Sequence, residues 1–231
     1  MLIIDNKLIM VRVPRSATTH LQMFFDHFKL AHQHPGHLHR PASSCSFGFL
    51  PTFATIQDPE RWYRSFWRYF IDPPSTIQTN PLLRDCHLEL ANGDGFKGWL
   101  QRVTSGAPID LNTPFLLPLS PRGEGGGTDS FPHPFWADRE SRGGGLYTYV
   151  WRFMTDAKTI PIRVCDLHRE IRKCMLMHDV EWTDAMDDWW DYSSPTNALK
   201  QKPKLDADMV SWIRNSEQDI YDGYRPDGRP G

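Results

Sequence analysis

The sequence predicts an α/β fold, a three-layer arrangement in which a short parallel sheet lies between helices. Apolar runs typical of buried strands occur at residues 8–13, 47–56 and 159–164. Between these runs, apolar residues recur at the three- and four-residue spacing of helices with one buried face. Because strands that alternate with helices pair in parallel and are covered by those helices, this order favours a layered α/β domain.

Length and composition favour a single globular domain spanning residues 1–231. A chain of 231 residues is long enough for one well-buried core and too short for two comfortable domains. The formal net charge is -2, from 26 basic and 28 acidic residues. With no global basic field, we expect neither nucleic acid nor an anionic membrane as a partner, and any anion site must be local.

The cysteines and the apolar segments indicate a soluble cytoplasmic protein. Cys45, Cys86, Cys165 and Cys174 form no Cys-x-x-Cys pair, so neither a zinc site nor a disulfide framework is indicated. The chain also lacks a basic leader followed by a long apolar run, and no apolar stretch approaches the ~20 residues that span a bilayer.

The first predicted strand runs into the loop Pro14-Arg15-Ser16-Ala17-Thr18-Thr19 and then into a helix over residues 18–30. Such a loop presents backbone N–H groups, hydroxyls and the positive end of a helix dipole to one point, which suits a phosphate-like anion. The alternative is an ordinary strand-to-helix turn, with Ser16 or Thr18 as the helix cap.

The second predicted strand ends at Gln57-Asp58-Pro59 and is followed by a helix over residues 60–70 that mixes aromatic with basic residues. Parallel strands emerge at the same edge of a sheet, so this loop and the first one would flank one crevice. Aromatic and basic residues could form a platform for nucleic acid. The helical spacing of Trp62, Phe66 and Tyr69 favours a core-facing stripe instead.

The remaining chain predicts further helices separated by irregular segments. We expect one helix or two short ones within residues 85–101, with Phe96, Trp99 and Leu100 buried. Other helices are predicted over residues 146–154, 166–177 and 206–221, and the Gly- and Pro-rich residues 118–145 are typical of a mobile loop or lid. A loop carrying Trp182, Trp189 and Trp190 either packs under the terminal helix or lines an acceptor site.

The two strand-end loops together resemble the sulfotransferase family, closest to its carbohydrate-type and sulfotransferase-like members. The family's first motif is a strand followed by Pro-Lys-Thr-Gly-Thr-Thr or a close variant that opens a helix, and this chain has Pro14-Arg15-Ser16-Ala17-Thr18-Thr19. The second motif is Arg-x-Pro with a Ser six residues after the Pro. This chain has Gln57-Asp58-Pro59 and then Ser65 at that spacing.

The resemblance implies a P-loop NTPase-like architecture and a transfer of a sulfuryl group from 3'-phosphoadenosine 5'-phosphosulfate (PAPS) to a hydroxyl. The acceptor would be a sugar or another small polar molecule, and no metal is required. The cofactor-binding residues that it implies are Pro14, Arg15, Ser16, Ala17, Thr18, Thr19, Gln57, Arg61 and Ser65. Ser65 would contact the 3'-phosphate.

Two positions depart from the family pattern. Arg15 stands where the family usually has Lys, and a planar guanidinium holds an anion as a fork rather than a point charge. Gln57 replaces the Arg that pairs with the 3'-phosphate, so another cation would have to substitute. The candidates are Arg61, Arg64 and the C-terminal lysines Lys200, Lys202 and Lys204.

Sulfuryl transfer also needs a base for the acceptor's proton, and His suits that work at neutral pH. The resemblance places the base in the histidine-rich loop between the two motifs, where His37 is the first choice and His39 the second. These histidines could instead be solvated surface. A metal site would need acidic partners that the neighbouring sequence does not offer.

Two other functions remain open. A catalytically degenerate member of the family would bind the nucleotide without turnover, as Arg15 and Gln57 suggest. A phosphoryl transferase could use the same first loop, but the chain shows no clear Mg²⁺-holding carboxylate after a strand.

Overall fold

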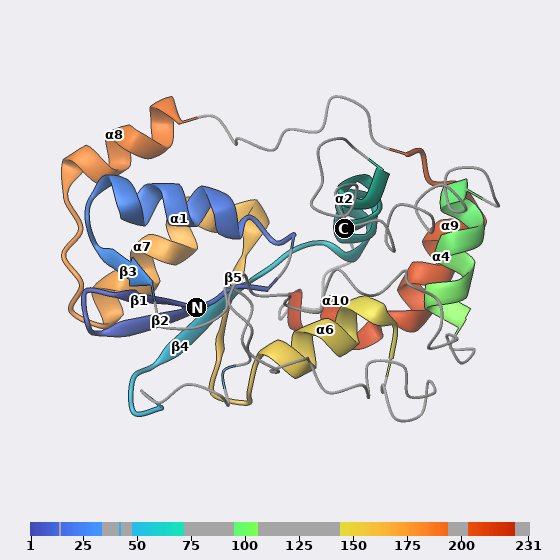
Figure 1. Cartoon of the computed structure of the whole chain (residues 1–231), viewed down its shortest axis with the longest axis horizontal. Coiled ribbons are helices and arrows are strands. Elements are labelled where there is room, and N and C mark those ends of the chain that lie inside the picture. The colour runs from blue at the N-terminus through green and yellow to red at the C-terminus, as the bar shows by residue number, and fades with distance from the viewer. Residues whose placement is uncertain are drawn as a thin grey trace, which may run out of the picture. The chain divides into compact units, whose positions relative to one another are not determined.

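The computed structural model describes residues 1–13, 15–33, 42, 48–71, 95–105, 144–193 and 203–224. The contacts group the chain into two compact units, and Figure 1 labels the helices and strands along the chain. The first unit comprises residues 1–58 and 151–199, and the second comprises residues 59–150 and 200–231. The first contains the sheet, and the second is helical where it is described.

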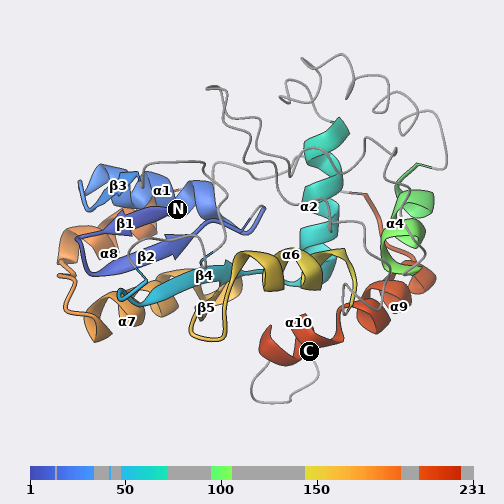
Figure 2. The same cartoon turned by 60° about the horizontal axis from the view of Figure 1, so that its bottom comes forward.

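The first unit is built on a five-stranded sheet in the order β3-β1-β2-β4-β5. Its strands are β1 (Leu2–Ile4), β2 (Leu8–Val11), β3 (Ala31–Gln33), β4 (Thr52–Ile56) and β5 (Ile160–Arg163). β2, β4 and β5 are parallel, and Figure 2 shows β2 and β4 side by side. These three strands lie within the predicted segments 8–13, 47–56 and 159–164, so the prediction of an α/β fold is confirmed.

The sheet is mixed rather than parallel, which corrects the prediction. β1 pairs antiparallel with both β2 and β3. The cause is a tight turn after Ile4, in which Asp5 has φ 47° and Asn6 has φ 55°. Left-handed φ at both central residues is the geometry of a hairpin turn that matches the twist of its strands. The apolar residues before the turn therefore fold back on β2 and add an edge to the parallel strands.

Two helices of the first unit lie on one face of this sheet, and a third packs against those two. They are α1 (Thr18–His27), α7 (Leu167–Met177), which follows a short 3-10 turn, and α8 (Asp184–Tyr192). Successive strand residues point to opposite faces. The strand residues in the core shared with these helices come from one face: Leu2, Ile4, Leu8, Met10, Phe53 and Ile162. Each fully buried apolar side chain contributes about 1.5–3 kcal/mol to stability.

The opposite face of the sheet is also buried. Ile9, Val11 and Ala54 are fully buried, and Ile3 and Ile56 are nearly so. Burial of both faces is compatible with a three-layer α/β fold.

The tryptophan segment forms a helix instead of the predicted loop. Trp189 and Trp190 lie within α8, whose first turn carries Asp184 and Asp187, acids that favour a helix N-terminus. Both rings and that of Trp182 lie 5.2–5.5 Å from the ring of Phe24 on α1. These tryptophans pack against α1.

The second unit contains α2 (Pro59–Ile71), α4 (Gly95–Ser105), the start of α6 (Leu146–Met154), α9 (Ala207–Ser216) and α10 (Gln218–Tyr224). Trp62 and Phe66 on α2 are buried and stack with ring centroids 4.5 Å apart. Trp62 also stacks on Tyr147 at 4.4 Å. The core-facing stripe predicted for α2 is therefore confirmed for Trp62 and Phe66, and the side chain of Tyr69 lies outside the described residues.

The terminal segment is two helices rather than the continuous helix predicted over residues 206–221. Asp206 caps α9 by accepting a hydrogen bond from the Met209 N–H at 2.9 Å. The helix ends at Ser216, and Glu217, with φ -113°, separates it from α10. Glu217 leaves the helical conformation and its carboxylate is completely buried against α6. None of the described helices is both long and apolar enough to cross a membrane.

Candidate functional site

The loop between β2 and α1 has an unusual backbone. Arg15 has φ 63° and Ala17 has φ 61°, so two non-glycine residues lie in the left-handed region within three positions. This region costs an L-residue roughly 1–2 kcal/mol, and such strain persists only where the surrounding structure imposes it. Strained loops of this kind cluster at binding sites. Alternating backbone conformations also turn successive N–H groups toward one point and create a concavity for anions.

Among the residues that the structure describes, none provides an acidic or hydroxyl cap at the start of α1. Its N-cap is Ala17, which makes no side-chain cap hydrogen bond, and its first turn contains no acidic residue. The predicted caps, Ser16 and Thr18, are therefore wrong. The first N–H groups of a helix have no acceptor within the helix and carry the positive end of its dipole. An anion placed here would satisfy both.

Ser16 ties this loop to the sheet. Its side chain is completely buried, and its hydroxyl donates to the Val13 carbonyl at 2.7 Å and lies 2.9 Å from the Thr55 hydroxyl on β4. A hydroxyl has a single proton to donate, so Thr55 must be the donor in the second bond. The Ser16 hydroxyl is thus used within the fold, and its backbone N–H is the group that can face a ligand.

The end of β4 lies beside this loop, as the sequence predicts. β2 and β4 are parallel neighbours, so both carboxyl ends emerge at the same edge. The Gln57 side-chain amide donates to the Arg15 carbonyl at 3.4 Å, which is long for a hydrogen bond. Of the remaining predicted residues of the second motif, Arg61 is exposed and Ser65 half-buried on α2, in the second unit.

Two arginines lie within or just before the loop. Arg15 is half-buried within it, and Arg12, three residues earlier, is only 6% exposed. Burial lowers the pKa of Arg12, an effect partly offset by the charge of Asp26. The sequence analysis did not single out Arg12. It lies two residues after Met10 and therefore on the same core-facing side of the strand. A charged residue on a core-facing position is rarely buried without a purpose.

The other predicted residues fall in different places. Thr18 is buried and Thr19 is exposed in the first turn of α1. Pro14, His37 and His39 lie outside the described residues. Within the described part of the chain, no three His, Cys, Asp or Glu side chains come together as a metal site would require.

A second polar cluster, missed in the sequence, lies between α7 and α8. His168 Nε2 lies 2.8 Å from Asp187 Oδ1, and Trp182 Nε1 donates to the same oxygen at 3.0 Å. Burial would raise the pKa of Asp187, but the hydrogen bonds from His168 and Trp182 outweigh it and lower the pKa. The His168 ring stacks on Trp190 at 5.4 Å. These contacts hold α8 on α7 and are explained by packing.

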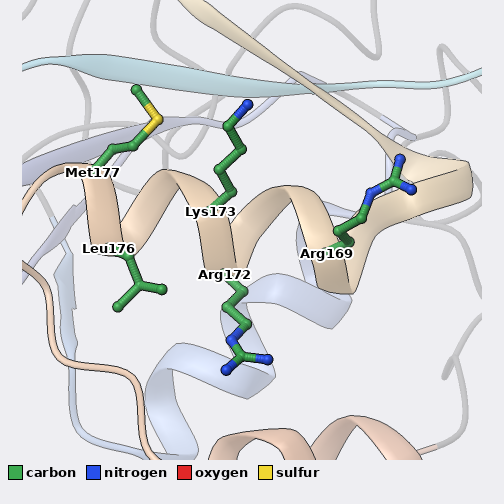
Figure 3. A pocket seen from close by; sticks show the side chains of 5 residues that line it. All are labelled: Arg169, Arg172, Lys173, Leu176 and Met177. Carbon is green, nitrogen blue, oxygen red and sulfur yellow. The ribbon is translucent and has the colours of Figure 1, made fainter.

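A groove along α7 is lined by Arg169, Arg172, Lys173, Leu176 and Met177 (Figure 3). Figure 3 shows Arg172 and Leu176 on one side of the helix and Lys173 and Met177 on the other. Arg172 lies 3.6 Å from Asp187, and Arg169 lies 3.2 Å from Asp166. Side chains that diverge from a single helix do not converge on a ligand, so the loop after β2 remains the candidate site.

Comparisons with models of protein families, with curated proteins and with solved structures found no match to this chain.

Proposed function

We propose that this chain is a PAPS-dependent sulfotransferase whose β2–α1 loop binds the 5'-phosphosulfate. The observation that carries the proposal is the uncapped start of α1, reached through left-handed Arg15 and Ala17 at the end of a central parallel strand. A terminal sulfuryl group on a phosphate offers the acceptors that such a loop needs. PAPS is the anion that we propose, because residues 14–19 and 57–65 resemble the two sulfotransferase motifs.

In this proposal each described loop residue has a defined task. The backbone N–H groups of Ser16, Ala17 and Thr18 hold the sulfuryl oxygens, and the Arg15 guanidinium stabilises charge on the leaving phosphate. Thr19, exposed in the first turn, adds a hydroxyl. The 3'-phosphate would be bound by Ser65, with Arg61 in the role of the missing arginine.

The reaction is an in-line displacement. The acceptor's hydroxyl oxygen bonds to sulfur while the bond from sulfur to the bridging phosphate oxygen breaks. The products are a sulfate ester and 3'-phosphoadenosine 5'-phosphate (PAP), and the acceptor's proton passes to His37 or His39. The acceptor is a sugar or another small polar molecule.

The finer fold assignment is part of the same proposal. We assign the parallel strands β2, β4 and β5, with α1 directly after β2, to a P-loop NTPase-like architecture in three layers. A cytoplasmic location belongs here too, and it is supported by the cysteine spacing alone.

Binding without turnover is the second candidate function. Gln57 favours it, because it stands where the family pattern has an arginine. Its neutral side-chain amide donates a hydrogen bond to the Arg15 carbonyl. Losing one charge-assisted contact costs about 1.5–3 kcal/mol of binding.

Calorimetry of the full chain with PAP tests the proposal. We expect binding, weakened by about tenfold or more in Arg15→Ala, because a charge-assisted contact to the anion is lost. Arg169→Ala, an exposed arginine on α7, is the matched control and should bind as the native chain does.

Three outcomes separate the functions. No binding at high micromolar PAP would overturn the sulfotransferase proposal, and tighter binding of ATP than of PAP would favour a phosphoryl transferase. PAP binding without sulfate-ester formation from PAPS, over a panel of hydroxyl acceptors, would favour the binding role.

A further inference from the structure

The β2–α1 loop is anchored by a short chain of hydrogen bonds that begins on the neighbouring strand. The Thr55 hydroxyl on β4 donates to the Ser16 hydroxyl at 2.9 Å, and the Ser16 hydroxyl donates to the Val13 carbonyl at 2.7 Å. Thr55 and Ser16 are both completely buried. A buried hydroxyl pair of this kind is costly to leave half-satisfied, so each bond fixes the position of the next group.

Ser16 is also the residue between the two strained positions. Arg15 and Ala17, on either side of it, have left-handed φ. Because relaxed backbone is available to both residues, something must hold the loop in the strained form. The Ser16 hydroxyl, which accepts a hydrogen bond from Thr55 on β4, belongs to the residue between these two strained positions.

We propose that Thr55 is a positioning residue for the anion-binding loop. Its hydroxyl holds Ser16 so that the N–H groups of Ser16, Ala17 and Thr18 stay directed at one ligand. Thr55 contacts the ligand only through Ser16, and its role rests on the proposed function of this loop. The sequence motifs gave no indication of it, since Thr55 lies inside the predicted strand.

The same strand carries a matched control. Thr52, at the start of β4, lies with its hydroxyl 3.1 Å from the Thr159 hydroxyl, which precedes β5. This pair is also buried and also joins β4 to another segment. It is three residues from Thr55 and belongs to the end of β4 that pairs with the beginning of β2. Loss of either threonine hydroxyl should cost similar stability, but only Thr55 reaches the loop.

The test compares three variants of the full chain: Thr55→Val, Thr55→Ser and Thr52→Val. We expect Thr55→Val to weaken PAP binding roughly three- to tenfold, the cost of one neutral hydrogen bond. Thr55→Ser keeps the hydroxyl and should restore binding. Thr52→Val should lower the unfolding midpoint to a similar extent as Thr55→Val and leave PAP binding unchanged.

Amide hydrogen exchange of residues 13–19 provides a readout that needs no ligand. Exchange should accelerate in Thr55→Val and remain native-like in Thr55→Ser and Thr52→Val. Equal weakening of PAP binding by Thr55→Val and Thr52→Val, or native exchange in Thr55→Val, would overturn the role of Thr55. If the native chain binds no PAP, the proposed function fails, and the exchange result alone then decides whether Thr55 positions the loop.

Discussion

The helices α1 and α6 differ in what is offered to the N–H groups of their first turns. α1 begins at Ala17, without a side-chain cap. α6 begins after Gly144 and Gly145, and its first turn binds the Glu217 carboxylate from the α9–α10 junction. The second helix start thus holds an anion from its own chain, and the first has no such group among the described residues.

The α6 start is a closed anion site. Glu217 accepts hydrogen bonds from the Tyr147 N–H at 3.0 Å and from the Thr148 N–H and hydroxyl, both at 2.7 Å. The Tyr63 hydroxyl donates to the same carboxylate. Glu217 is completely buried, and a Cβ on Gly145 would collide with it. No room is left for a ligand, so this arrangement serves the fold.

The comparison supports the role proposed for the α1 start. At α6 the protein fills the helix N-terminus with a buried carboxylate, whereas α7 and α8, like α1, begin without a side-chain cap hydrogen bond. At α1 it uses a neutral hydroxyl, Ser16, to shape the loop and leaves the helix N-terminus without a carboxylate cap. A site that is shaped but not filled is the arrangement that an external anion requires.

The largest loss of stability is expected when the Glu217 carboxyl group is removed from the start of α6. Glu217→Ala leaves the N–H groups of Tyr147 and Thr148 and the hydroxyl of Tyr63 buried without their acceptor. A buried donor left without its acceptor costs about 1–3 kcal/mol, and several donors lose theirs here. Urea denaturation should show this loss of the free energy of unfolding.

Asp222→Ala, an exposed acid on α10, is the control for Glu217→Ala. Surface substitutions usually change stability by less than about 0.5 kcal/mol. If both variants lose equally little, Glu217 does not serve as the internal anion of α6, and the contrast with α1 disappears.

The next effect is a pH dependence of stability. Burial raises the pKa of Glu217 to about 7 from 4.5, against the hydrogen bonds from Thr148 and Tyr63, which lower it. Between these values the folded protein keeps a proton that the unfolded chain releases, so the free energy of unfolding falls as pH rises from about 4.5 to about 7. The contribution amounts to about 3 kcal/mol.

Urea denaturation at pH 5 and pH 8 measures this contribution, and Glu217→Gln is the control because its amide does not titrate. Of the titratable groups near Glu217, Tyr63 has its pKa raised well above the usual value, by burial and by Glu217 itself. Glu60 and Arg214, 3.5 Å apart, pair with each other. An equal pH dependence in the native chain and in Glu217→Gln would show that other groups produce it.

Much of the fold follows from the sequence because its pattern is periodic. β2 and β4 are buried apolar runs, β5 lies within the predicted segment 159–164, and α6 matches the predicted residues 146–154. β1 and β3 are three residues each, too short for a period to show. β3 exists only through its pairing with β1, a tertiary contact that no local pattern encodes.

The candidate site could be predicted in its location and not in its detail. Residues 15–19 follow a strand, which fixes the helix start, and the parallel neighbour places Gln57 beside it. Left-handed φ at Arg15 and Ala17 could not be expected, since neither is glycine. Glu217 could have been noticed: Met209, Ile213, Glu217 and Ile220 recur at helical spacing in the sequence, which puts a carboxylate at a position where the pattern calls for a core residue.

The smallest effect concerns the backbone strain in the β2–α1 loop. Ala17→Gly should stabilise the folded protein by about 1 kcal/mol, the cost that a Cβ adds at left-handed φ. Gly95 gives the reverse experiment, since it has φ +62° at the start of α4 and nothing within 4 Å of an added Cβ. Gly95→Ala should therefore destabilise by a similar amount, through backbone conformation alone. Thermal unfolding of the two variants should shift in opposite directions. If Ala17→Gly instead destabilises, its methyl group contributes packing that outweighs the strain, and the α1 loop is held by more than Ser16 and Thr55.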